Sequence, residues 1–173
     1  MRTRTTLIAA SVVVGVALIS GTATAITSAP TVNAASDGDQ PSIVEDYSYP
    51  GADKILQDRG ITLISGDGHI ILVNCVGHTG VIEVYSDNSP GDHSTDPGHY
   101  CFQVSGPTGD LKLQIPYAFQ AKGDDQDAHN VQATVTINGT PSTVNVDKHG
   151  WTGFGEGAGQ DPATLVEIKV TGS

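Results

Sequence analysis

The sequence predicts an all-β domain: an antiparallel two-sheet β-sandwich of jelly-roll or immunoglobulin-like type, with one short N-terminal helix and one disulfide. Three observations carry this prediction. Short segments repeat a two-residue hydrophobic period, Gly and Pro turns separate them, and only one stretch has a helical pattern. A partly closed barrel is the alternative arrangement of the same strands.

The chain is expected to begin with a signal peptide that is cleaved after Ala25. Arg2 and Arg4 precede an apolar run, residues 7–19, and Ala23 and Ala25 occupy the positions that a signal peptidase recognises. An uncleaved membrane anchor is the alternative. The apolar run is shorter than the roughly 20 residues that a membrane span requires, so cleavage and release into the extracellular space are favoured.

Three parts are therefore expected: a signal peptide, 1–25, a flexible leader, 26–41, and one β-sandwich domain, 42–173. All 19 acidic residues but only six of the eight basic residues follow the signal, so six minus 19 gives the mature chain a net charge of −13. Nucleic acids and anionic membrane surfaces bind through Lys and Arg. Neither is therefore an expected partner, and the oligomeric state is left open.

The helix is predicted within YPGADKILQDRG, between the leader and the strands. Pro50 stands at its start, Ala52, Ile55 and Leu56 form an apolar side, and Gly60 is placed to end it. A helix this short depends on packing for its stability.

Nine strand segments follow, and several alternate apolar and polar residues, so that one face is expected to be buried and the other solvated. The segments are ITLIS, HIILVNC, VIEVYS, HYCFQVS, DLKLQIP, YAFQAK, NVQATVTI, STVNVD and TLVEIKVT. Asp67-Gly68 after the first segment and Asn138-Gly139 later in the chain are turn signatures, the second predicting a tight hairpin. Pro116 is expected to mark a strand end or corner.

Cys75 and Cys101 are the two cysteines of the chain, and in an exported protein they predict one disulfide. Closing a loop of about 25 residues would stabilise the fold by roughly 3 to 4 kcal/mol. A nucleophilic cysteine would leave its partner without a role, which makes a cysteine enzyme the weaker alternative.

The segment KHGWTGFGEGAGQDP is the candidate ligand-binding loop, since it places Trp151 and Phe154 among glycines. Exposed aromatic rings stack on sugar rings, and nearby polar groups fix the orientation of the ligand. The favoured alternative is that Trp151 caps the core and that the glycines only allow a tight turn.

The loop GDDQDAHN is the candidate metal site. Asp124, Asp125 and Asp127 offer carboxylate oxygens of the kind that Ca²⁺ prefers, and calcium is the one cofactor considered. The glycine and glutamate of an EF-hand are missing, so a solvated acidic loop is the favoured interpretation.

No catalytic constellation is found, and the protein is not expected to be an enzyme. Ser105 is followed by Gly-Pro, which is typical of a strand running into a turn rather than of a nucleophile. The six histidines form no H-x-H or H-E-x-x-H pattern, and no spacing nominates a pair of carboxylates.

The segments EDYSYPGADKILQDRGITLISGDGHIILVNC, YCFQVSGPTGDLKLQIP and ATLVEIKVTG together resemble small secreted proteins and terminal modules of Streptomyces and related actinobacteria. The resemblance covers residues 42–173. It implies export and a compact β domain, and it assigns no functional residue.

The leading functional prediction is a secreted, non-catalytic binding module for a polysaccharide, cell-wall component or protein, acting through loops at one end of the sandwich. The alternative is an inhibitor of an extracellular protease that presents a disulfide-braced loop between Cys75 and Cys101. A hydrolase has the least support.

Overall fold

The computed structural model describes residues 47–87 and 91–172, so the predicted signal peptide and leader lie outside the described residues. In chain order the elements are α1 (Ala52–Arg59), β1 (Thr62–Gly66), β2 (Ile70–Val73), β3 (Val81–Ser86), β4 (His99–Val104), β5 (Gly109–Lys122), β6 (His129–Ile137), β7 (Thr140–Val146), β8 (Trp151–Gly153), the 3-10 helix η1 (Gly155–Ala158) and β9 (Ala163–Gly172). Within this part of the chain no helix has the length and apolar character needed to cross a membrane.

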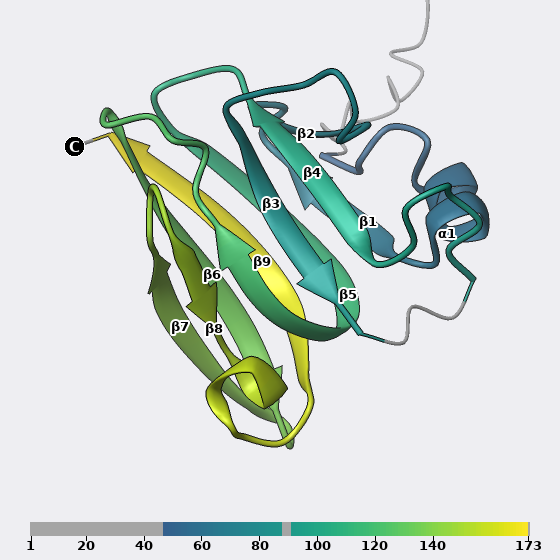
Figure 1. Cartoon of the computed structure of the whole chain (residues 1–173). Helices are drawn as coiled ribbons and strands as arrows, with labels where there is room; N and C mark the ends of the chain where they lie inside the picture. Colours follow the sequence, from purple (N-terminus) through teal and green to yellow (C-terminus); the bar gives the residue numbers. More distant parts are fainter. Residues whose placement is uncertain (1–46, 88–90, 173) are drawn as a thin grey trace, which may run out of the picture. The chain divides into compact units, whose positions relative to one another are not determined.

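The nine strands form one antiparallel sheet. Its order is β2-β4-β3-β5-β9-β6-β7, and β1 and β8 both pair with β5. Figure 1 shows β5 as a long, curved strand. The predicted all-β fold with one short helix is confirmed. Its division into two separate sheets is not, because hydrogen bonds through β5 connect all the strands.

Strand β5 contains a bend where two separate strands were predicted. Its first half pairs with β1 and β9, and its second half pairs with β3 and β8. The register with β9 shifts between Ile115 and Ala118, and Tyr117 in this interval has a φ of 54°. Pro116 has no N–H to donate, and its carbonyl oxygen accepts a hydrogen bond from Ser86 Oγ at 2.5 Å. The chain therefore turns a corner at Pro116 without ending the strand.

The two predicted turns have different outcomes. Asn138 and Gly139 have φ values of 49° and 78° and join β6 to β7 in the tight hairpin that the sequence predicts. Gly68 also has the positive φ, 82°, that its turn signature predicts. This turn does not join a hairpin, because β1 pairs with β5 and β2 pairs with β4. Asp67 Oδ2 instead accepts a hydrogen bond from the Asp110 N–H at 3.1 Å, which fixes this turn against β5.

Helix α1 ends as predicted, because Gly60 adopts the left-handed conformation (φ 67°) and donates its N–H to the Leu56 carbonyl oxygen. Ile55 packs against the core, whereas Leu56 is exposed. The apolar side of the helix is therefore narrower than predicted.

The core is built from the inward-facing residues of the sheet. Its largest fully buried side chains include Tyr100 and Phe102 of β4, Leu113 of β5 and Phe154, which follows β8. Three of these four side chains are aromatic, so aromatic rings fill a large part of the core.

The glycine-rich segment contains β8, a strand that the sequence did not predict, and then packs closely on β5. The Phe154 N–H donates to the Phe119 carbonyl oxygen at 2.9 Å. A Cβ at Gly153 would lie 2.5 Å from the Gly157 carbonyl oxygen, and a Cβ at Gly157 would lie 2.0 Å from that of Phe119. Gly155 has a φ of 53°. These glycines are therefore required for the close approach of two backbone segments.

Replacing Gly157 by alanine is expected to lower the free energy of unfolding by roughly 3 kcal/mol, because the new Cβ overlaps the Phe119 carbonyl oxygen, a backbone atom of β5 that also accepts the Phe154 N–H. Gly172→Ala is the matched control, since a Cβ there meets only the Pro107 carbonyl oxygen at 3.7 Å. Urea unfolding measures both variants. Equal stability of the two would contradict the close packing of this segment.

Candidate functional site

The structure separates the two residues of the predicted aromatic platform. Phe154 is 1% exposed and belongs to the core, because the backbone contact with β5 turns it inward. Trp151 is 46% exposed. The expected pairing of Trp151 and Phe154 as one surface is thus corrected: Phe154 caps the core, and Trp151 lies at the surface.

Trp151 belongs instead to a row of rings across the sheet. The imidazole of His99 stacks on the phenol of Tyr85 with centroids 4.2 Å apart and an interplanar angle of 10°. The Trp151 indole meets Tyr85 edge-on at 5.2 Å, and Phe119 lies 6.3 Å from Tyr85. We call His99, Tyr85 and Trp151 the aromatic row.

Strand register assembles this row. Tyr85 of β3 pairs with His99 of β4 on one side and with Gln120 of β5 on the other, while Trp151 of β8 pairs with Lys122 of β5. In β3 the residues on either side of Tyr85 are buried, so the alternation of the strand turns the phenol outward. The rings therefore stand on a rigid, hydrogen-bonded surface.

A pocket of about 550 Å³ lies beside the aromatic row. It is lined by Tyr85, Ser86, Asp87, Phe119, Glu156 and Gly157. Two aromatic residues and two carboxylates therefore share one concave surface, a combination of flat apolar faces and a few polar groups that suits ligand binding.

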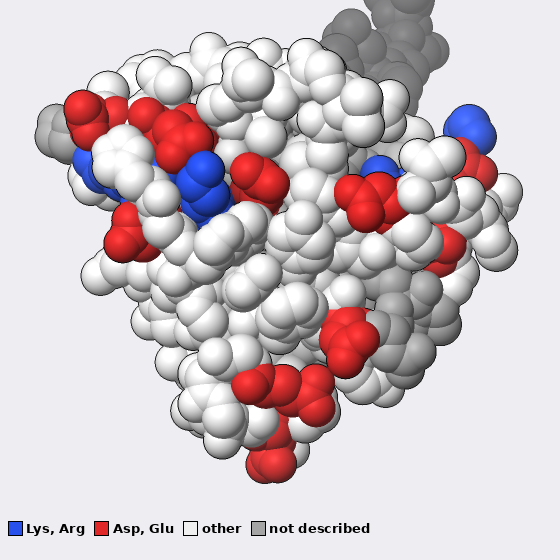
Figure 2. Space-filling model, viewed as in Figure 1, with Lys and Arg blue, Asp and Glu red and all other residues white. Residues whose placement is uncertain are grey.

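The surroundings of the row are acidic. Burial, and then the negative charges of Asp96 and Glu83, raise the pKa of the Tyr85 hydroxyl above its usual value. In Figure 2 acidic groups outnumber basic ones, and a broad area without charge lies between them. The Tyr85 ring of the row therefore stays uncharged at physiological pH, next to the carboxylates of Asp96 and Glu83.

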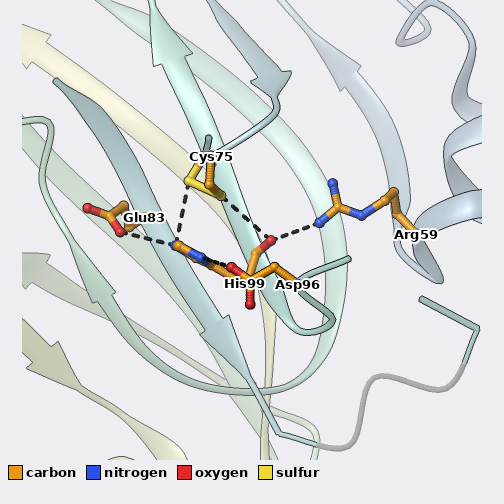
Figure 3. Close-up of a disulfide and its surroundings, with 6 residues drawn as sticks. Arg59, Cys75, Glu83, Asp96 and His99 are labelled. Carbon is orange, nitrogen blue, oxygen red and sulfur yellow. Dashed lines mark hydrogen bonds and ion pairs between the residues drawn. A yellow bond between two sulfur atoms is a disulfide. The ribbon is translucent and has the colours of Figure 1, made fainter. Parts of the chain in front are cut away.

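His99 is held from all sides at the disulfide end of the row (Figure 3). Its Nδ1 lies 2.6 Å from Asp96 Oδ2, and its Nε2 lies 3.0 Å from Glu83 Oε2. Arg59 Nη2 donates to the His99 carbonyl oxygen at 2.8 Å. Both ring nitrogens of His99 therefore already lie beside a carboxylate oxygen. These contacts hold the imidazole in its stacked position on the Tyr85 ring.

The predicted disulfide between Cys75 and Cys101 is confirmed. Their sulfur atoms and a ring nitrogen of His99 form the one set of three metal-type donors within 4.8 Å of one another in the described residues. The two sulfurs are bonded to each other and are not thiolates, so this set does not provide a metal site.

The three carboxylates of the predicted calcium site face different partners. Asp124 is buried and its Oδ2 lies 2.5 Å from His129 Nδ1. Asp125 Oδ2 accepts a hydrogen bond from Lys122 at 3.0 Å, and Asp127 Oδ1 lies 3.3 Å from His149 Nε2. Calcium binding stays a prediction, and the observed arrangement favours it less than ion pairing within the loop.

The chain between the cysteines is not a single loop, because β3 and the start of β4 lie within it. Val76, directly after Cys75, is 85% exposed. The His78 N–H donates to the Cys75 carbonyl oxygen at 3.4 Å, and Gly77 has a φ of 88°, so these residues form a tight turn. Protease inhibition stays a prediction without a specific structural argument.

Sequence reasoning missed Tyr85, Phe119 and His99 as members of the site. The available signal was the outward position of Tyr85 in VIEVYS, where an aromatic residue occupies a position expected to be solvated. No protein-family model and no curated protein matches the chain, so its resemblance to actinobacterial secreted proteins stays a prediction.

Proposed function

We propose that the protein is an exported, non-catalytic module that binds polysaccharide through the aromatic row. The observation that carries this proposal is the pair of adjoining rings of Tyr85 and Trp151 on neighbouring strands, with Trp151 nearly half exposed. In this proposal the binding surface is centred on a sheet face, whereas the sequence prediction placed it on the end loops.

The chemistry of the surface supports a sugar ligand. The apolar faces of pyranose rings pack on aromatic rings, and hydroxyl groups need nearby hydrogen-bonding groups. Gln120 lies between Tyr85 and β8 in the sheet and is half-buried, so its amide is available beside the rings. A row that crosses several strands suits consecutive units of a chain better than a single sugar.

We also propose that the protein is exported and that its sheet folds into two layers. The disulfide supports an oxidising compartment outside the cytoplasm. The bend of β5, whose two halves pair with different strands on both sides, supports a sheet folded into two layers in the manner of a sandwich.

The test measures binding of soluble polysaccharides and cell-wall fragments through the fluorescence of the protein's single tryptophan. A bound sugar is expected to exclude water from Trp151 and shift its emission to shorter wavelength. Trp151→Ala is expected to weaken binding about tenfold, since an aromatic stacking contact contributes about 0.5 to 1.5 kcal/mol beyond its buried area. Calorimetry measures the variant, which has no fluorescent reporter.

Tyr47→Ala is the matched control, because Tyr47 is an exposed aromatic residue outside the row. It is expected to bind like the wild type. If Trp151→Ala keeps the fold and every affinity of the wild type, or if no glycan binds the wild type, the proposal fails.

A further inference from the structure

We infer that the polysaccharide is cationic and carries free amino groups, as in polymers of glucosamine, and that Asp87 and Glu156 bind its ammonium groups. This inference rests on the proposed function and names the ligand class of the same site. It follows from the charges and rings of the pocket beside the aromatic row.

The two carboxylates of this pocket are free of cationic partners. Among the described residues, the side chains of Asp87 and Glu156 form no ion pair or hydrogen bond, and both residues are exposed. Other carboxylates are paired: Asp92 with Arg59 and Asp125 with Lys122. The pocket therefore holds uncompensated negative charge that a cationic ligand would neutralise.

Aromatic rings in the same pocket favour the same ligand charge. Tyr85 and Phe119 line it, and an ammonium group over such a ring is attracted by the negative face of the π system. A carboxylate beside a ring strengthens this attraction, because both act on the same positive group. The combination distinguishes an amino sugar from a neutral sugar, which gains only from stacking.

No lysine or arginine lines the pocket. Lys122 pairs with Trp151 in the sheet, but its Nζ donates to Asp125 at 3.0 Å. Sugars with carboxylate or phosphate groups would meet Asp87 and Glu156 without a compensating cation. Charge complementarity therefore favours amino sugars over acidic polysaccharides.

The experiment compares two hexamers of the same backbone, fully N-acetylated and fully de-N-acetylated, by calorimetry at low ionic strength. The wild type is expected to bind the de-N-acetylated hexamer about tenfold more tightly, and added salt is expected to reduce this preference. In Asp87→Asn/Glu156→Gln the preference is expected to disappear, while the affinity for the acetylated hexamer stays.

Asp53→Asn/Asp127→Asn is the matched control, because it removes the same charge from two exposed residues outside the pocket. It is expected to keep the preference. Equal affinity of the wild type for both hexamers, or a preference that survives in Asp87→Asn/Glu156→Gln, overturns the inference and leaves the proposed function standing. Absence of binding to either hexamer and to every other glycan overturns both.

Discussion

Replacing Asp92 by alanine is expected to lower the free energy of unfolding by about 3 kcal/mol. The Asp92 side chain is 0% exposed, and its Oδ1 accepts hydrogen bonds from Arg59 Nε at 3.1 Å and from the Ser94 N–H at 3.0 Å. Its Oδ2 accepts the Gly98 N–H at 3.0 Å. Removing the carboxylate leaves a largely buried guanidinium and two N–H groups without their acceptor. Leaving one partner of a buried ion pair uncompensated in this way strongly destabilises the folded state.

The consequence extends to the end of the aromatic row. Arg59 also binds the His99 carbonyl oxygen, and its guanidinium lies 4.9 Å from the centroid of the Tyr100 ring. Chemical unfolding measures the effect, with Asp127→Ala as control because Asp127 is almost fully exposed. The control is expected to change stability by less than about 0.5 kcal/mol. Similar losses in both variants would show that Asp92 does not organise this region.

The same carboxylate is expected to make stability depend on acid pH. Burial acts to raise the pKa of Asp92, but hydrogen bonds from Ser94, Gly98 and Arg59 outweigh it and hold the pKa below its usual value. The stabilisation is therefore complete above the unfolded-state pKa of about 4 and is lost as pH falls through the native value. Unfolding curves from about pH 6 to pH 2 should fall less steeply in Asp92→Ala than in the wild type. Parallel curves would contradict the assignment.

Removing the disulfide is expected to lower the free energy of unfolding by roughly 3 to 4 kcal/mol, since the bond joins residues 26 positions apart and restricts the unfolded chain. It also ties the segment after β2 to β4, and β2 stands at the edge of the sheet. Cys75→Ala/Cys101→Ala tests this in urea. Wild-type protein unfolded in the presence of a dithiol reductant is the matched control and should lose a similar amount. Unchanged stability in both cases would mean that the bond does not restrict the unfolded state.

Local signals predicted local structure. Gly60 ends the helix, and Asn138-Gly139 forms the hairpin, because both depend on backbone conformations that only nearby residues decide. The disulfide followed from the count of two cysteines. The corner at Pro116 was also predicted, but the sequence did not show that one strand continues through it, since that depends on partners from β3 and β9.

The candidate site was harder to predict. Trp151 and Phe154 stand three residues apart among glycines, and nothing in that spacing tells which ring is buried. The contact between the Phe154 N–H and β5 decides it. Tyr85 joins Trp151 only because β5 lies between their strands in the sheet.

By itself the sequence determined the all-β class, the single short helix, the acidic charge and the cysteine pair. Each of these follows from composition or from the local period of hydrophobic residues, which do not depend on contacts between distant parts of the chain. Only the tertiary structure decided that the strands share one sheet, that Phe154 enters the core, and that His99, Tyr85 and Trp151 form a row. The physical reason is that strand register makes neighbours of side chains that lie far apart in the sequence. Many strand pairings are locally acceptable, and packing of the whole core selects one of them.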